Sequence, residues 1–179
     1  MANNCAYNMK VVGNRKEDVD EFLSMMDYSH PEGKFFARIF EAYPYNFKEE
    51  NGKYAMFIAG DCAWSVYSCM CGGIFTYYTD NQKNDNQITN LAIETKRLNL
   101  KVEIYSQEPG VGFAEHIIYD NGECVEMEET DFEEYWDLDN MTIEEFEQEH
   151  GITLSMEQIY TLETDGYIAI GGYDEVFTI

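Results

Sequence analysis

The chain has 179 residues, of which 45% are apolar and 15% are aromatic, enough to build a folded core and too many for a disordered chain. It carries 35 acidic residues against 11 basic ones, a net charge of −24. This balance argues against binding nucleic acid through its phosphates and against docking on an anionic membrane surface. The sequence has no signal-peptide pattern and no apolar run of about 20 residues, so we expect a cytoplasmic protein.

The first 105 residues predict alternating strands and helices. Asn14 is the expected N-cap of the first helix, because Glu17 follows three residues later as in a capping box. Asn51-Gly52 predicts a tight hairpin, and Gly60 is expected to separate two aromatic-rich strands. The expected elements are a strand over 4–12, a helix over 15–27, strands over 35–43, 54–59 and 63–70, a helix over 86–98 and a strand over 102–105.

With the two segments on either side of Gly60 counted as one strand, this order is strand, helix, strand, strand, helix, strand. It is that of the ferredoxin-like split β-α-β arrangement, in which two helices cover one face of an antiparallel sheet. We therefore predict an α+β fold class with a ferredoxin-like core over residues 1–106. The apolar residues that recur at helical spacing are expected to pack against the sheet: Val19, Phe22, Leu23, Leu91 and Leu98.

Residues 107–179 are expected to add an acidic extension packed on that core as one unit. Asn121-Gly122 lies between segments 113–119 and 123–128, which predicts a second hairpin. Two capping boxes, Thr142 with Glu145 and Ser155 with Gln158, predict short helices over 143–150 and 156–162. Closing strands are expected over 167–170 and 175–179.

The charge is divided unevenly along the chain. The first 101 residues hold 13 acids and all 11 bases, whereas the 78 residues that follow hold 22 acids and no Lys or Arg. A surface of one sign repels itself and destabilises the compact state, so this segregation indicates a functional gain. Solubility or adaptation to salt is the simpler interpretation, but adaptation to salt would acidify both halves.

The acids are densest between Glu123 and Glu149, where aromatic residues such as Phe132 and Trp136 lie among them. We expect the rings to anchor this segment and the carboxylates to face solvent. A disordered segment that folds on its partner is the alternative. The predicted partner-binding residues are Glu123, Glu126, Glu128, Glu129, Asp131, Glu133, Glu134, Asp137, Asp139, Glu144, Glu145 and Glu147.

Motifs for catalysis or metal binding are weak. The five cysteines are an odd number, which indicates free thiols, and Cys62, Cys69 and Cys71 lack a fourth ligand at zinc-site spacing. Glu115 and His116 are adjacent on an expected strand and would face opposite sides, which argues against a catalytic pair. We find no nucleophile elbow, HExxH helix, dinucleotide fingerprint or calcium loop. We therefore predict no catalytic residue, no metal and no cofactor.

Two segments carry a family resemblance. Residues 3–13 (NNCAYNMKVVG), followed by KEDVDEF, and residues 104–116 (IYSQEPGVGFAEH) resemble the YubB-type ferredoxin-like family of phage, plasmid and other mobile-element proteins. Residues 61–65 give a third, weaker match. The resemblance covers about residues 3–120. It implies the ferredoxin-like fold and a mobile-element context, and it carries no catalytic residue onto this chain.

We hypothesise a non-enzymatic inhibitor, encoded by a phage or mobile element, that binds a host nuclease or other DNA-binding protein. A CRISPR nuclease is the preferred target, in the manner of anti-CRISPR proteins. The carboxylates would imitate DNA phosphates in a channel lined by Lys and Arg. The protein itself would bind neither nucleic acid nor membrane. The alternatives are a small acidic interaction module with an unrelated partner and a hydrolase-type enzyme that uses Glu115 and His116.

Overall fold

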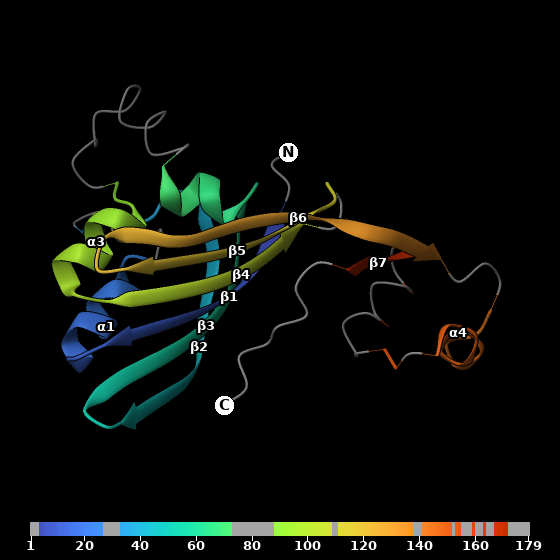
Figure 1. The fold of residues 1–179 in the computed structure, drawn as a ribbon, viewed down its shortest axis with the longest axis horizontal. Helices are drawn as coiled ribbons and strands as arrows, with labels where there is room; N and C mark the ends of the chain where they lie inside the picture. The colour runs from blue at the N-terminus through green and yellow to red at the C-terminus, as the bar shows by residue number, and fades with distance from the viewer. Residues whose placement is uncertain are drawn as a thin grey trace.

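A computed structural model describes residues 4–26, 33–72, 88–108, 111–137, 141–151, 153–154, 159, 163 and 167–171, with the backbone alone at 50, 130–137, 150 and 167–171. The elements (Figure 1) are β1 (Asn4–Gly13), α1 (Lys16–Ser24), β2 (Ile39–Glu50), β3 (Lys53–Ala63), the π-helix η1 (Tyr67–Cys71), α3 (Leu91–Leu98), β4 (Lys101–Glu108), β5 (Phe113–Asp120), β6 (Glu123–Asp137), α4 (Ile143–His150) and β7 (Tyr167–Gly171). Within these residues, no helix combines the length and the apolar character that crossing a membrane requires.

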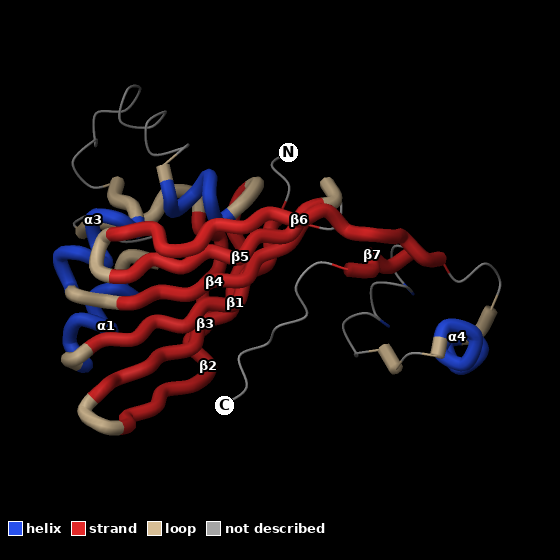
Figure 2. Tube along the Cα trace, viewed as in Figure 1, coloured by secondary structure: helices blue, strands red, loops and turns tan. Residues whose placement is uncertain are grey.

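The strands form an antiparallel sheet in the order β2-β3-β1-β4-β5-β6-β7. Helix α1 packs against β1 and β3, while α3 packs against β5 and β6, and the two helices touch each other. Figure 2 shows β5 and β6 continuing the sheet past β4, so the chain after residue 106 extends the same sheet. The fold is α+β, as predicted, and its sheet is larger than that of the predicted four-stranded core.

The strand register gives the sheet two unlike faces. One row of paired residues crosses five strands as Ile58, Met9, Ile104, Ile117 and Met127, and its first four members are buried in the core with the helices. The neighbouring row, on the other face, is Ala59, Asn8, Tyr105, His116 and Glu128. Because successive side chains alternate between faces, the second row lies on the side away from the helices.

The predicted core residues pack as expected. Val19, Phe22, Leu91 and Leu98 are buried, and Leu23 is partly buried against the same cluster. The rings of Phe22 and Phe36 lie 5.3 Å apart between centroids, which joins α1 to the segment that leads into β2.

Helix and strand starts differ from the prediction at three places. Asn14 is not the N-cap of α1: Arg15 occupies that position, without a side-chain cap, and its guanidinium lies 3.7 Å from the Glu17 carboxylate that a capping box would use. Strand β2 begins at Ile39 rather than at residue 35. Helix α3 begins at Leu91, because the Asn90 side chain accepts a hydrogen bond from the Ile93 amide and caps it there.

Gly60 does not break a strand, contrary to the prediction, and β3 runs through it. The Tyr7 hydroxyl reaches across Gly60 to donate to the Glu41 carbonyl oxygen at 2.9 Å. A Cβ at position 60 would collide with both of these groups, so the strand needs glycine for space and not for a turn.

The predicted strand over 63–70 is wrong, because residues 67–71 form η1. The Ser65 hydroxyl accepts a hydrogen bond from the Ser68 amide at 3.0 Å, and the Cys69 amide donates to the Ser65 carbonyl. These local bonds close helical turns on a segment whose apolar, aromatic composition favours a strand.

In the acidic extension, the helix over 143–150 and its Thr142–Glu145 capping box are confirmed, and β7 confirms the strand over 167–170. The Ser155–Gln158 box, most of the helix over 156–162 and the strand over 175–179 lie outside the described residues.

Candidate functional site

The acidic strand β6 is positioned by the hairpin that precedes it. Asn121 and Gly122 have φ of +48° and +92°, the pair of positive values that a two-residue hairpin requires. The Asn121 amide donates to the Leu100 carbonyl, and the Gly122 amide donates to the Thr95 hydroxyl at 3.0 Å. The turn is therefore tied to the end of α3, and β6 returns along β5 in a defined register.

That register contains a one-residue shift. Tyr119 pairs with Cys124, but Ile118 pairs with Glu126, so Val125 is an extra residue on β6, a β-bulge. An unshifted hairpin would place Met127 opposite His116. Because of the bulge, Glu128 lies opposite His116, and Glu126 and Glu128 share its face of the sheet.

The predicted partner-binding carboxylates with described side chains lie on both faces of β6 and on α4. Glu123, Glu128 and Glu129 on β6 are exposed and Glu126 is half-buried. Glu129, opposite Glu115, lies on the helix face, away from Glu126 and Glu128. The backbone of β6 carries Asp131, Glu133, Glu134 and Asp137, whose side chains are not described, and Asp139 lies outside the described residues.

Two carboxylates of α4 accept hydrogen bonds from backbone amides at or near the ends of the helix. Glu145 accepts from the Thr142 amide at 2.9 Å in the capping box, and Glu147 accepts from the Leu154 amide at 2.7 Å. Glu144 is exposed, and Phe146 between them is fully buried, which agrees with the expectation that aromatic residues anchor this segment. The predicted residues whose side chains the structure describes therefore do not form one flat array.

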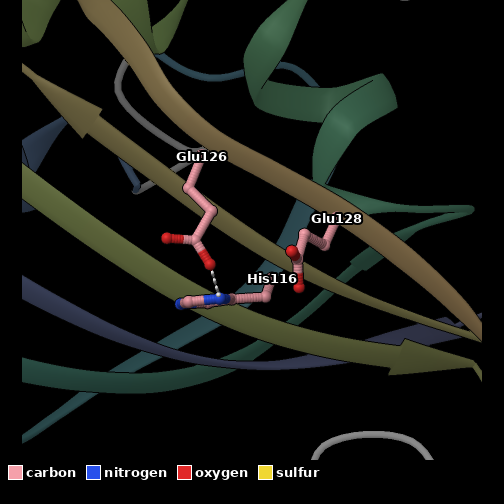
Figure 3. A group of neighbouring side chains, drawn as sticks. All are labelled: His116, Glu126 and Glu128. Atoms are coloured by element: carbon pink, nitrogen blue, oxygen red, sulfur yellow. Dashed lines mark ion pairs between the residues drawn. The ribbon is translucent and has the colours of Figure 1, made fainter.

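His116 is the centre of a second group of side chains, on the sheet face away from the helices (Figure 3). Its Nδ1 lies 2.8 Å from a Glu126 oxygen, and its Nε2 lies 3.2 Å from a Glu103 oxygen. The Tyr105 ring stacks on the imidazole at 4.1 Å with an interplanar angle of 1°. The imidazole is thus held in one plane, buried, with a carboxylate at each nitrogen.

Glu115 lies on the opposite face from His116, as predicted, so the two do not form a pair. Its carboxylate accepts hydrogen bonds from the Val66 amide at 3.0 Å and from the Ser106 hydroxyl at 2.8 Å. Burial raises the pKa of Glu115 and outweighs these hydrogen bonds, which lower it. Because it accepts a hydrogen bond from the Val66 amide, just before η1, the Glu115 side chain on β5 has a structural role.

The cysteines are all free thiols, and three of them lie together in the core. Cys5 and Cys62 are opposite each other in the register of β1 and β3, with both thiols free. Cys69 donates a hydrogen bond to the Ala63 carbonyl at 2.9 Å. Hydrogen bonds with Cys5 and Cys69, together with burial, raise the pKa of Cys62. A thiol that stays protonated is a poor nucleophile and a poor metal ligand, so Cys62 acts as a core residue.

The grouping around His116 was missed in the sequence. The Asn121-Gly122 turn predicts the hairpin, but an unshifted register places Glu126 and Glu128 on the opposite face. The signal that was present is the spacing of Glu103 with Tyr105 and of Glu126 with Glu128, each pair two residues apart, on the two strands that flank β5.

Comparison with known proteins identifies no relative: no family model matches the chain, and neither the curated proteins nor the solved structures contain a significant match.

Proposed function

We propose that this chain is a non-enzymatic inhibitor that binds the basic DNA channel of a host nucleic-acid enzyme through β6 and α4. The observation that carries the proposal is the segregation of charge: β5, β6 and β7 contain no Lys or Arg, and neither does any residue after Lys101. Carboxylates in this region therefore have no Lys or Arg on their own strands, and a partner would supply these cations.

The shape of β6 supports an extended contact. Its first part pairs with β5 and its last part pairs with β7, so the strand projects past the rest of the sheet (Figure 1). Eight of its fifteen residues are acidic. At about 3.3 Å per residue, the strand is about 50 Å long and carries one carboxylate per ~6 Å.

Duplex DNA presents one charge per ~1.7 Å of its axis, so β6 alone has roughly a quarter of the charge density of DNA. A DNA-like surface needs further carboxylates, and α4 supplies Glu144 and Glu149, both exposed. The proposed interface is therefore the combined surface of β6 and α4.

Among such enzymes, a CRISPR nuclease is the preferred target, because its channel is positively charged over about 20 base pairs and recognises backbone shape. The YubB-type resemblance supports a mobile-element origin, which fits this target. The order β1-α1-β2-β3-α3-β4, with strands arranged β2-β3-β1-β4, likewise supports the proposed ferredoxin-like core over residues 1–106.

The test is inhibition of a purified, guide-loaded CRISPR nuclease, together with capture of binding proteins from a bacterial lysate. A reversal variant replaces Glu129, Glu133 and Glu134 with Lys. Glu128 is left unchanged, because its carboxylate lies beside His116. The control changes the charge equally in the other half, by replacing the exposed Glu17, Glu41 and Glu49 with Lys.

We expect the first variant to lose binding and the control to retain it. Binding of the unmodified chain should weaken steeply with salt and compete with duplex DNA. Equal loss in both variants would mean that only net charge matters. If the lysate yields only proteins that do not bind nucleic acid, the acidic interaction module with an unrelated partner replaces the inhibitor.

A further inference from the structure

The group around His116 has the composition and spacing of a metal site. The ligand atoms of His116, Glu126 and Glu128 all lie within 4.8 Å of one another (Figure 3). They come from two adjacent strands, β5 and β6, and the Val125 bulge brings them to one face. Their burial is graded: the imidazole is buried, Glu126 is half-buried and Glu128 is exposed, so the group is open to solvent on one side.

We propose that His116, Glu126 and Glu128 bind a first-row transition-metal dication, of which Zn²⁺ is the most suitable probe. One imidazole nitrogen with two carboxylates is a donor set that Zn²⁺ accepts in proteins. Mg²⁺ and Ca²⁺ prefer oxygen ligands alone, so the imidazole discriminates against them. Three protein ligands leave at least one position for water or for a side chain of a partner.

The distances require a small adjustment. Zinc ligands lie about 2.0–2.1 Å from the ion, which places two ligands of a tetrahedral ion roughly 3.3 Å apart. His116 Nδ1 and the Glu126 oxygen are 2.8 Å apart without an ion. The Glu126 side chain must therefore withdraw by roughly half an ångström, and Glu128 must rotate inward. Glu128 is exposed and Glu126 is half-buried, so both carboxylates lie toward the solvent side of the group.

Glu103 acts as a positioning residue for this site. It contacts Nε2 of His116, which leaves Nδ1 directed toward Glu126. A carboxylate on the far nitrogen of a ligating histidine fixes the ring and strengthens the metal–nitrogen bond. The stacked Tyr105 ring prevents the imidazole from turning out of this plane. Glu103 and Tyr105, both on β4, therefore orient the proposed ligand His116 on β5.

The metal would cross-link β5 to β6 beside the bulge and neutralise two carboxylates of the acidic strand. This inference uses the geometry of His116 and does not depend on the inhibitor proposal. The competing explanation is diffuse accumulation of cations around a chain of net charge −24. The experiment must separate a defined site from that general attraction.

The test is calorimetric titration of the chelator-treated full chain with ZnCl₂ at about 150 mM NaCl, where diffuse attraction is screened beyond ~8 Å. All proteins carry Cys124→Ser, because the exposed Cys124 thiol on β6 could bind Zn²⁺ by itself. Glu128→Gln removes a ligand without disturbing the core. Glu129→Gln is the matched control, because it removes the same charge from the next residue on the other face.

We expect one saturable Zn²⁺ site, weakened at least tenfold by Glu128→Gln and less than twofold by Glu129→Gln. Glu103→Gln should weaken binding about tenfold with an unchanged Tm. A hundredfold excess of Mg²⁺ should not displace Zn²⁺. Equal effects of the two Glu→Gln changes, displacement by Mg²⁺ or the lack of a saturable site would each overturn the proposal.

Nitrogen NMR of the imidazoles identifies the ligand independently of affinity. Zn²⁺ should shift Nδ1 of His116 and leave the resonances of His30 and His150 unchanged. A shift confined to His30 or His150 would place the ion elsewhere and would contradict the assigned site.

Discussion

The two halves of the chain stabilise their carboxylates in different ways. In the first half, Glu94 is fully buried and is contacted by Lys34 at 2.8 Å and by Arg97 at 2.7 Å. Burial by itself raises the pKa of Glu94, but hydrogen bonds from Lys34, Thr89 and Arg97 outweigh burial, and the pKa is lowered. The buried anion is therefore compensated by two cations.

In the second half, no Lys or Arg follows Lys101, and the partners of the described carboxylates include amides, hydroxyls and one imidazole. Glu145, exposed at the start of α4, has its pKa lowered by the Thr142 backbone amide and hydroxyl. Glu115, buried with two backbone amides and two Ser hydroxyls as hydrogen-bond donors, has its pKa raised by burial. Hydrogen bonds from neutral groups therefore suffice to keep the pKa of a surface carboxyl low, but they do not outweigh burial in the core.

The largest expected effect is a loss of stability when an aromatic residue of the main core, Phe22, is truncated. Truncation of Phe146, the buried aromatic residue of α4, should have a local effect instead. Phe22→Ala should cost about 3–5 kcal/mol, because the fully buried ring packs on Phe36 in the main core. Phe146→Ala, although also fully buried, should release α4 locally. Chemical denaturation measures the first effect, and amide hydrogen exchange at 143–150 measures the second. An equal loss of global stability in both variants would show that the two halves unfold as one unit.

The next largest effect is the loss of stability expected when the buried, ion-paired Glu94 is made neutral. Glu94→Gln should destabilise the fold by about 2 kcal/mol at pH 7, because it weakens charge-assisted hydrogen bonds to a buried group. The folded-state pKa is lowered, so the contribution of Glu94 is present above its usual pKa of 4.5 and is lost as pH falls below it. The difference between the two proteins should therefore shrink at acid pH in thermal melts. A difference that is constant from pH 7 to pH 3 would assign it to packing.

Glu115→Gln should have the opposite sign and a smaller size, below ~1 kcal/mol. Its folded-state pKa is raised, so the ionised form destabilises the fold at neutral pH, and the amide oxygen can still accept from Val66 and Ser106. The variant should melt higher than the unmodified chain at pH 7, and the gain should vanish as pH falls through 4.5. A lower Tm at pH 7 would mean that the charge itself holds η1 in place.

The smallest expected effect on stability is that of Glu129→Lys, within about 0.5 kcal/mol, because the side chain is exposed. Repulsion among the β6 carboxylates should even decrease. Urea denaturation with circular dichroism checks this result. A loss above 2 kcal/mol would show that Glu129 has a structural role, and partner-binding data from its variants would then need reinterpretation.

Much of the fold follows from local signals. Turn chemistry at Asn51-Gly52 and Asn121-Gly122 and the Thr142–Glu145 capping box act over two to four residues, so they are visible in the sequence. The apolar spacing of Val19 and Phe22 likewise identifies the buried side of α1. The charge segregation is a property of the sequence alone.

Features that depend on residues distant in the sequence are set by tertiary contacts. Gly60 lies within a strand because Tyr7 and Glu41 occupy the space beside it. The Val125 bulge decided which carboxylates join His116, since a one-residue shift moves every later side chain to the other face of the sheet. The sequence thus determined that β6 is an acidic strand returning from a tight turn. The register of that strand against β5, which periodicity alone does not specify, decided that two of its carboxylates meet an imidazole.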